Sequence, residues 1–527
     1  MLKKLSGIII IISCCFAVVC FKMSGIMADN NITQAVANSG KYTLYTDYEY
    51  PAIYDCNFKK LNNTQKKYYA VVMPEANSVM SVLPYAVDKK SLLNRLENKM
   101  PFLCEVNTEG LNNPELIVFS STVRTNDSML APHIVGYCSD GIGICGVERA
   151  FGEYISSIKT RNKITYNVDA VGGILDGTTY KLEKSSEIKA GVVTTIDSDI
   201  QQICETAAKG INRGAVLVMD VNTGEIKACV SKPDFNPSNV SIYLDDADSP
   251  MINRAFSAYN VGSIFKLVIA ASALESGISP EYTYTCTGKI SIKDVEFSCH
   301  KWDGHQEIDM CTAMAESCNT YFINLSTFIS NDKILEISKS FGFGNNSLLC
   351  SGMISQAGNV QNMSELQIPA EKANMSFGQG KLTATPLQVT LLTATIANGG
   401  KTPAPVLISG IFDKQGEFLP YSNYKSHRSI SEQTAEQLQN FMVKTVQVDN
   451  SRSKPLLTSA GGKTSTAQTG KFNGNNIEQS TCWFTGFFPV DNPKYAVTVV
   501  VEDGITGNIS CGPVFKEIAD NITKEKK

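Results

Sequence analysis

An uncharged apolar run near the N-terminus is the first clear feature of the hydrophobic pattern. Residues 5–21 (LSGIIIIISCCFAVVCF) contain no charged side chain and directly follow Lys3 and Lys4. A helix of this length is about 25 Å long, near the lower limit for crossing a bilayer. Because lysines favour the cytoplasmic side, the run predicts a single-pass anchor within residues 1–28 and an exported remainder.

A removed signal peptide is the alternative interpretation of this run. Cleaved signal peptides have apolar cores of about 7–15 residues and small residues just before the cleavage site. Here the run is longer, and Ile26 stands two positions before Ala28, where a small residue is expected. The retained anchor is therefore favoured, and with either interpretation the bulk of the chain is exported.

Strand patterns become dense only after residue 190. Residues 30–190 are irregular, with short β-rich stretches such as YYAVVM (68–73), and they lack a dense set of catalytic residue types. Further on, two hairpins are predicted from apolar segments joined by turn residues. The predicted strands are 191–197, 215–221 paired with 225–231, and 480–488 paired with 495–502.

Two helices accompany these strands. Residues 198–209 follow the strand at 191–197 as a helix with Ser198 as its N-cap. The segment from Ser263 (SIFKLVIAASALES) is apolar on nearly every side and stops at Gly277, as expected for a helix inside a core. Strands, then helices, then strands predict an α+β fold with an antiparallel sheet flanked by helices.

Composition narrows the class of protein. Lys+Arg 47 against Asp+Glu 51 gives a net charge of −4 without long runs of one sign, which argues against nucleic-acid binding. A hydrophobic content of 43% is sufficient for at least one large core. Only four histidines are present, so mechanisms that need several imidazoles are disfavoured.

Ser263 and Lys266 form the first candidate chemical motif. Gly262 allows a sharp turn into the helix, so that Ser263 lies at its start and Lys266 one turn later on the same face. Apolar neighbours would lower the pKa of the lysine and make its neutral amine a base for the serine hydroxyl. Alone, this spacing is equally well explained by a capping serine and a lysine that reaches solvent.

Two further motifs are weak individually. Ser317 and Asn319 flank Cys318, and a hydroxyl and an amide two residues apart can project into one cleft, although ordinary polar turns look the same. Residues 461–466 (GGKTST) place a lysine and hydroxyls behind two glycines, which suits a strand edge that binds a carboxylate and an extended substrate. The alternative interpretation of residues 461–466 is a solvent-exposed, glycine-containing segment at the start of a strand.

In this order the three motifs resemble the SxxK, SxN and KTG set of penicillin-binding proteins and serine β-lactamases. Flanking segments resemble the class B, monofunctional penicillin-binding proteins over most of residues 190–520, and 52–57 and 134–155 weakly resemble their membrane-proximal pedestal. The segments that carry the resemblance are 214–237, 253–275, 317–322, 374–388, 462–470 and 483–504.

The resemblance implies a peptidoglycan D,D-transpeptidase with the penicillin-binding transpeptidase fold. Ser263 would attack the penultimate D-Ala carbonyl of a stem peptide, with Lys266 as general base and Ser317 as the proton relay to the leaving amine. An amine of a neighbouring stem peptide would resolve the acyl-enzyme. β-Lactams would acylate the same serine because they mimic D-Ala-D-Ala. No cofactor is required by this reaction.

Substrate-binding residues follow from the same resemblance. Asn319 would hold the substrate amide, Lys463 and Thr464 the terminal carboxylate, and Thr466 would join Ser263 in an oxyanion hole. The family usually has glycine where this chain has Ser465, at a point where the substrate backbone passes close to the strand, so the resemblance implies a steric contact between Ser465 and substrate. We expect the added hydroxymethyl group to shift β-lactam selectivity without loss of activity.

The resemblance also implies a domain organisation and a location. Residues 1–28 would be the cytoplasmic tip and membrane anchor, 29–190 an elongated, β-rich, non-catalytic pedestal, and 191–527 the transpeptidase domain. The catalytic domain would lie outside the cytoplasm. Expected partners are peptidoglycan stem peptides, β-lactams, the membrane and other wall-synthesis proteins, a polytopic glycosyltransferase among them; nucleic acid is not expected.

A cysteine–histidine group between the first two motifs is a candidate metal site. Two thiolates and one or two imidazoles can bind structural Zn²⁺ tetrahedrally, with Asp294 or Asp303 as a further candidate ligand. A Cys286–Cys299 disulfide and free thiols are the alternatives, and Cys138 and Cys145 are a second candidate pair. The candidate zinc ligands are Cys286, Cys299, His300 and His305.

Three other functions stay open at this point. A serine β-lactamase would share the acylation chemistry, but it needs a group that activates water and usually lacks a pedestal and anchor. A D,D-carboxypeptidase would use water as the acceptor. A non-catalytic scaffold or β-lactam sensor would keep the fold, although intact motif residues argue against it. The lifetime of a penicilloyl complex separates the first from a transpeptidase.

Overall fold

The structure is a computed structural model with side chains, and the description covers most of the chain. Asp29, which follows the candidate cleavage site, lies outside the described residues. The described residues are 2–28, 40–73, 75–95, 100–108, 116–125, 129–139, 141–169, 180–185, 188–421, 425–472, 474, 476 and 478–526.

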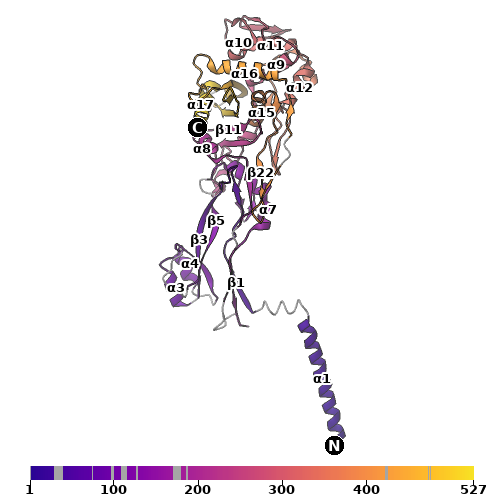
Figure 1. The fold of residues 1–527 in the computed structure, drawn as a ribbon, viewed down its shortest axis with the longest axis vertical. Coiled ribbons are helices and arrows are strands. Elements are labelled where there is room, and N and C mark those ends of the chain that lie inside the picture. The colour runs from indigo at the N-terminus through magenta and orange to yellow at the C-terminus, as the bar shows by residue number, and fades with distance from the viewer. Residues whose placement is uncertain are drawn as a thin grey trace. The chain divides into compact units, whose positions relative to one another are not determined.

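The chain divides into two compact units (Figure 1). The first comprises Met1–Tyr50, Thr64–Arg124 and Ile158–Ile188, and the second comprises Pro51–Asn63, Thr125–Ser157 and Lys189–Lys527. Segments 51–63 and 125–157 therefore pack with the C-terminal part of the chain, although they precede residue 190.

In its described residues, the first unit contains two three-stranded sheets and three helices. Helix α1 covers Leu2–Ala28; within the described residues, no helix reaches the combination of length and apolarity needed to cross a membrane. The sheet orders are β4-β3-β5 and β1-β8-β9. The other elements are β1 (Lys41–Tyr45), β3 (Asn63–Val72), α3 (Ala76–Val82), α4 (Lys89–Asn94), β4 (Phe102–Val106), β5 (Val118–Thr125), β8 (Lys163–Asn167) and β9 (Lys181–Glu183).

An antiparallel five-stranded sheet forms the centre of the second unit. Its order is β12-β11-β27-β26-β25, so β25 is an edge strand. The predicted hairpins are confirmed, since β11 pairs with β12 and β26 with β27. The strands are β11 (Gly214–Asp220), β12 (Ile226–Lys232), β25 (Gly461–Phe472), β26 (Glu478–Phe488) and β27 (Tyr495–Glu502).

Helices cover both faces of this sheet because successive side chains of a buried strand point to opposite sides. Val216 and Val218 pack with α8 (Ser198–Ala207) and α17 (Gly512–Glu525) in one hydrophobic cluster. Leu217 and Met219 belong to another cluster with α9 (Lys266–Glu275), α15 (Pro386–Ala397) and α16 (Glu432–Gln447). The predicted α+β arrangement of an antiparallel sheet flanked by helices is confirmed.

The buried helix α9 is confirmed, whereas the predicted cap of α8 is wrong. A 3₁₀ turn, η5 (Gly262–Phe265), leads into α9, on which residues 266–273 are buried. Asp197, not Ser198, caps α8 by accepting hydrogen bonds from the backbone N–H groups of Asp199 and Ile200. The Ser198 hydroxyl instead donates to Asp55, 2.6 Å away, because a long-range carboxylate competes for it.

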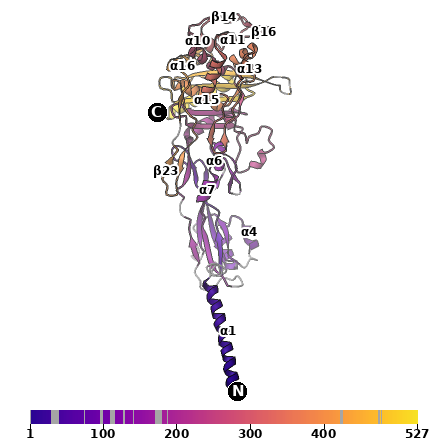
Figure 2. The same cartoon turned by 90° about the vertical axis from the view of Figure 1, so that its right-hand side faces the viewer.

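Short elements complete the second unit. Near α11 lie two antiparallel pairs, β14 with β17 and β15 with β16, and Figure 2 labels β14 and β16 beside α10 and α11. These elements are β14 (Tyr284–Cys286), β15 (Lys289–Ile292), β16 (Val295–Ser298), β17 (Gln306–Ile308), α10 (Met310–Ala315), α11 (Asn319–Thr327), α12 (Asn331–Ser340), α13 (Met363–Leu366) and α14 (Pro369–Ser376).

A second sheet of order β2-β10-β22-β23 also belongs to this unit. Its strand β10 begins as predicted at Gly191 but ends at Thr194. The remaining elements are β2 (Ala52–Tyr54), α5 (Pro132–Val135), β6 (Cys138–Ser139), β7 (Ile142–Gly143), α6 (Gly146–Ala150), α7 (Gly152–Ile158), β13 (Tyr259–Asn260), β18 (Leu348–Cys350), β19 (Met353–Ile354), β20 (Thr383–Ala384), β21 (Lys401–Thr402), β22 (Ile408–Phe412), β23 (Phe418–Pro420) and β24 (His427–Arg428), with 3₁₀ turns η2 (Ala208–Gly210), η3 (Val240–Tyr243) and η4 (Arg254–Phe256) and a π-helical turn η6 (Gly507–Cys511).

Candidate active site

Ser263 lies in the first helical turn before α9, where its side chain is half-buried. The preceding residue, Gly262, has φ +60°, and a Cβ there would lie 2.3 Å from Ser465 Oγ and 3.0 Å from Ala467 Cβ. Only glycine fits this close approach to β25 without rearrangement. The turn at Gly262 that the sequence predicted is present, and it also brings the serine next to the third motif.

Lys266 is fully buried and lies at the centre of a polar cluster. Its Nζ is 3.1 Å from Ser263 Oγ and 3.1 Å from Ser317 Oγ, and it donates to the backbone oxygen of Ser317 at 2.6 Å and to Asn319 Oδ1 at 2.7 Å. We call Ser263, Lys266, Ser317 and Asn319 the lysine cluster. The structure therefore brings the first two motifs together around one amine.

Burial lowers the pKa of Lys266 well below its usual value, and the nearby charge of Lys463 lowers it further. A neutral amine has two N–H groups and one lone pair. The two shortest contacts, to the Ser317 carbonyl and Asn319 Oδ1, match the two donors. The lone pair is then left for a serine hydroxyl, which is the arrangement that a general base requires.

Ser317 is held in an uncommon backbone conformation, with φ +54°. Non-glycine residues in this region carry strain of about 1–3 kcal/mol, and such strain persists where surrounding contacts determine the geometry. Here the Ser317 carbonyl accepts from Lys266, and the Cys318 N–H donates to Ala313 O at 2.9 Å. The strained turn at the start of α11 directs both Ser317 and Asn319 toward Lys266.

The third motif lies on the edge strand β25, as predicted. Lys463 is fully buried, and its Nζ donates to the Thr464 carbonyl at 3.1 Å. Burial lowers its pKa to about 8. Thr464 is half-buried and Thr466 is exposed, so their side chains alternate with those of the buried Lys463 and Ser465 along the strand. The Thr466 hydroxyl accepts from the Gly507 N–H at 3.1 Å.

Ser465 does not lie on the exposed face of β25. Its side chain is only 3% exposed, and its hydroxyl donates to the Val261 carbonyl at 2.9 Å. The hydroxymethyl group of Ser465 is therefore directed toward the loop that precedes Ser263. This orientation gives Ser465 a bracing contact between the first and third motifs in place of the expected steric contact with substrate.

A cysteine–histidine cluster lies immediately beside the second motif. Its four ligand atoms, one from each residue, lie within 4.8 Å of one another. His300 is not a member: it is exposed, and its Nδ1 is 3.9 Å from Cys299 Sγ. Asp294 and Asp303 are also exposed and outside the group. The cluster consists of Cys286, Cys299, His305 and Cys318.

Cys318 belongs to this cluster but was not among the candidate ligands predicted from the sequence. Its position inside the second motif, beside two polar residues, gave no local sign of contact with cysteines 19 and more residues away. The 16 cysteines in the structure are all free, so the suggested Cys286–Cys299 and Cys138–Cys145 bridges are not formed. Cys138 Sγ instead lies 3.2 Å from Glu148 Oε2.

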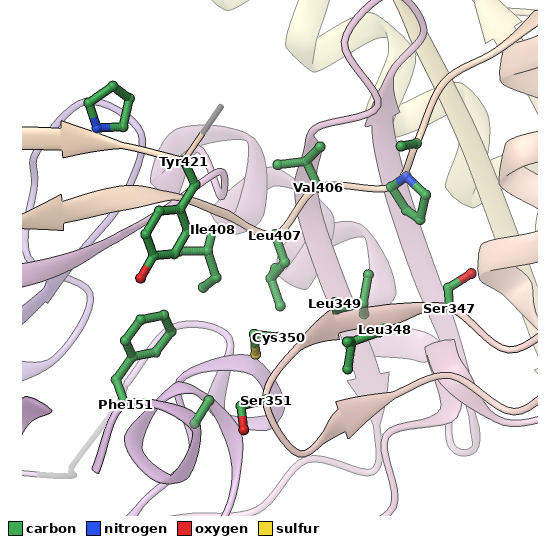
Figure 3. Close-up of a pocket in the computed structure, with 14 residues that line it drawn as sticks. Phe151, Ser347, Leu348, Leu349, Cys350, Ser351, Val406, Leu407, Ile408 and Tyr421 are labelled. Carbon is green, nitrogen blue, oxygen red and sulfur yellow. The ribbon is translucent and has the colours of Figure 1, made fainter. Parts of the chain in front are cut away.

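A separate apolar pocket of about 870 Å³ contains none of the predicted site residues. Figure 3 shows Phe151 and Tyr421 near one side and Leu348 to Cys350 of β18 on another. The rings of Phe151 and Tyr421 stack with their centroids 6.3 Å apart. This pocket lacks the combination of buried amine and hydroxyl groups found around Lys266.

Comparison with known proteins points to one family. Residues 214–520 match the family model described as the penicillin-binding protein transpeptidase domain. The chain is 28% identical over 353 residues to peptidoglycan D,D-transpeptidase PbpA of Mycolicibacterium smegmatis, a match covering 61% of this chain and 70% of that protein.

Solved structures support the same fold. Penicillin-binding protein A from M. tuberculosis, in a ceftriaxone acyl-enzyme complex, superposes with a TM-score of 0.65 at 21% identity, covering 89% of this chain and 97% of that one. A chain from a peptidoglycan synthase complex that coordinates polymerization and crosslinking gives a TM-score of 0.70 at 21% identity, covering 98% and 97%.

Proposed function

The chain belongs to the penicillin-binding protein transpeptidase family, and from this membership we propose that it is a serine D,D-transpeptidase that cross-links peptidoglycan stem peptides and is acylated by β-lactams. Its relative from M. smegmatis is named a peptidoglycan D,D-transpeptidase. The observation that carries the proposal is the fully buried Lys266 amine, 3.1 Å from the Ser263 hydroxyl.

Acylation begins with attack on the penultimate D-Ala carbonyl carbon. Ser263 Oγ forms the new C–O bond while its proton passes to the lone pair of neutral Lys266. The bond to the terminal D-Ala nitrogen then breaks, and Ser317, within 3.1 Å of the same amine, passes a proton to the leaving amine. An amine of a second stem peptide attacks the ester carbonyl and restores the serine.

The remaining motif residues hold the substrate. Asn319 binds the substrate amide, while Lys463 and Thr464 attract the terminal carboxylate. The backbone N–H groups of Ser263 and Thr466 form the oxyanion hole, where loss of one donor typically costs about 3–4 kcal/mol in the transition state. The edge position of β25 supports this role, because an extended peptide can pair along an unpaired strand edge.

The bond-making chemistry needs no cofactor, since the base, nucleophile and relay are side chains of the chain itself. A structural Zn²⁺ at the cysteine–histidine cluster would take no part in these steps.

For the whole chain we propose the domain order anchor (1–28), pedestal (29–190) and transpeptidase domain (191–527), with the catalytic domain outside the cytoplasm. Lys3, Lys4 and the uncharged run 5–21 support the anchor. A polytopic glycosyltransferase and other wall-synthesis proteins are the proposed partners, supported by the similarity to a chain of a peptidoglycan synthase complex. A protease-accessibility assay on intact spheroplasts would show a catalytic domain digested from outside if this orientation is correct.

Labelling of the full-length chain with fluorescent penicillin tests the proposed reaction. Wild type should gain one penicilloyl mass on the peptide that contains Ser263, and Ser263→Ala should gain none. Ser272→Ala is the matched control, because Ser272 lies on the same buried helix and its hydroxyl only donates to Val268 O. Labelling of Ser263→Ala equal to that of the control would overturn the proposal.

The fate of the adduct separates the related functions. A penicilloyl complex that persists for many minutes, together with cross-linked product from two stem peptides, supports a transpeptidase. Rapid hydrolysis of penicillin indicates a β-lactamase, release of D-Ala without cross-linking indicates a D,D-carboxypeptidase, and a folded chain that never forms an adduct indicates a scaffold.

A further inference from the structure

Four residues from separate short elements converge beside the second motif. Cys286 ends β14, Cys299 follows β16, His305 precedes β17, and Cys318 is the N-cap residue of α11. Three of the four come from the two small antiparallel pairs β14–β17 and β15–β16. The fourth comes from the helix that carries the second motif, so the cluster joins these pairs to α11.

Three distances within the cluster match edges of a zinc tetrahedron, and all four ligand atoms lie within 4.8 Å of one another. With Zn–S near 2.3 Å and Zn–N near 2.05 Å, tetrahedral geometry requires S···S edges of about 3.8 Å and S···N edges of about 3.6 Å. Cys299 Sγ lies 3.8 Å from Cys318 Sγ, and Nδ1 of His305 lies 3.6 Å from the sulfurs of both Cys286 and Cys299.

Burial and neighbouring groups also suit a metal. The exposed fractions of Cys286, Cys299 and Cys318 are 0%, 7% and 0%. Thr320 Oγ1 lies 3.0 Å from Cys286 Sγ and 3.4 Å from Cys318 Sγ, as an outer hydroxyl that hydrogen-bonds ligating sulfurs. The ring nitrogen of His305 that faces the cluster is Nδ1. The other ring nitrogen, Nε2, is buried and has no hydrogen-bond partner among the described residues.

The backbone around the cluster is tightly closed. Gly304 has φ +76°, and a Cβ there would lie 2.0 Å from the Cys286 carbonyl. The Cys299 N–H donates to the Gly288 carbonyl at 2.8 Å. These contacts bring the chain before His305 against the chain after Cys286. Because two-stranded pairs are marginally stable alone, this region gains from an additional link.

We propose that Cys286, Cys299, His305 and Cys318 bind one structural Zn²⁺ that fastens the β14–β17 segment to the start of α11. A ligand set of three sulfurs and one imidazole is typical of a closed zinc site and unlike the oxygen sites of Mg²⁺ or Ca²⁺. A single disulfide within the group would leave the third cysteine and the histidine without a role.

The site has a consequence for the second motif, and this part rests on the proposed function. Cys318 lies between Ser317, held at φ +54°, and Asn319, whose Nδ2 donates to the Ser298 carbonyl at 3.4 Å. A metal that holds Cys318 therefore fixes the turn that directs Ser317 and Asn319 toward Lys266. The four ligands act as positioning residues and do not touch the reacting atoms.

Metal analysis of the full-length chain tests the site directly. Zinc-replete wild type should contain about one zinc per chain, and Cys286→Ala and His305→Ala should fall below about 0.2. Cys204→Ala is the matched control, since Cys204 is a fully buried cysteine of the same unit in another cluster; it should retain the zinc. Less than about 0.2 zinc in wild type, with either free thiols or a Cys286–Cys299 disulfide in the mass spectrum, overturns the proposal.

Cobalt exchange keeps the test valid if the variants fail to fold. Wild type loaded with Co²⁺ should show thiolate-to-cobalt charge transfer and the intense visible bands of tetrahedral coordination. Weak octahedral bands without charge transfer would overturn the assignment. Chelation should release the metal and slow penicillin acylation, and Zn²⁺ should restore both. Failure of the wild type to form any penicilloyl adduct contradicts the proposed function but leaves the metal measurements decisive for the site.

Discussion

The lysine cluster and the cysteine–histidine cluster meet at residues 317–319, yet they accommodate burial in opposite ways. In the lysine cluster, the buried amine finds oxygen partners at 2.6 and 2.7 Å within the chain. In the cysteine–histidine cluster, three sulfurs and one ring nitrogen lie within 4.8 Å of one another, and every one of them is a metal ligand by type. In the proposed function the first group works with the chain alone, whereas in the proposed zinc site the second is completed by a cation.

The lysine cluster and the cysteine–histidine cluster therefore have different tasks. Burial in the lysine cluster lowers the pKa of Lys266 and so prepares a base, which is a chemical task. The cysteine–histidine cluster meets the same turn through Cys318, and its proposed task is to hold that turn. Variants in the two clusters should therefore differ in how strongly they slow acylation and in whether they lose zinc.

The largest expected effect is that of Lys266→Met. Without the base, acylation by fluorescent penicillin should slow by about 10³-fold, in line with the usual contribution of general-base catalysis. Zinc content should stay unchanged, because Lys266 is not a ligand. Lys372→Met is the control, as Lys372 is another partly buried lysine that donates to Ile329 O at 2.6 Å. An equal loss in both variants would show that general destabilisation, not the base, was measured.

Cys318→Ala should have an intermediate effect on acylation and a complete effect on metal. Removal of a group that orients a site typically costs about 10- to 100-fold, so we expect acylation about 10-fold slower together with loss of zinc. Stopped-flow acylation and metal analysis on the same preparation check both. Loss of zinc with an unchanged acylation rate would separate the two clusters and contradict the positioning role.

A smaller effect is expected in the pH dependence of stability. Burial lowers the pKa of Lys463 to about 8, against 10.5 for an exposed lysine. Between these values the unfolded chain binds more protons than the folded one, so the unfolding free energy rises with pH. Each such lysine contributes up to about 1.4 kcal/mol per pH unit in this window. Denaturant unfolding should show a shallower rise for Lys463→Met; an identical slope would contradict the lowered pKa of the buried lysine.

The smallest effect is expected for Ser465→Ala. The substitution removes the hydrogen bond to the Val261 carbonyl, which should lower the unfolding free energy by about 1 kcal/mol. Penicillin acylation should change less than about threefold, because the hydroxyl braces the loop before Ser263 without facing the exposed side of β25. Markedly faster acylation would instead favour the steric role expected from the sequence.

Prediction from sequence succeeded where a property depends on neighbouring residues. The buried helix α9 followed from an apolar pattern on all sides, and the hairpins followed from turn residues between apolar segments. Prediction failed at the cap of α8, where Asp197 replaces Ser198 because Asp55 binds the Ser198 hydroxyl. It also failed to include Cys318 among the candidate ligands, since nothing in the local sequence relates that residue to Cys286.

By itself, the sequence determined the order of motifs and the one-turn spacing of Ser263 and Lys266, because helix geometry is local. Only the tertiary structure decided that Lys266 is fully buried beside Ser317 and Asn319, that Ser465 faces Val261, and that Cys318 replaces His300 in the cysteine–histidine cluster. Burial, pKa and ligand sets depend on segments distant in the chain, and these are brought together only when the sheet and its helices pack.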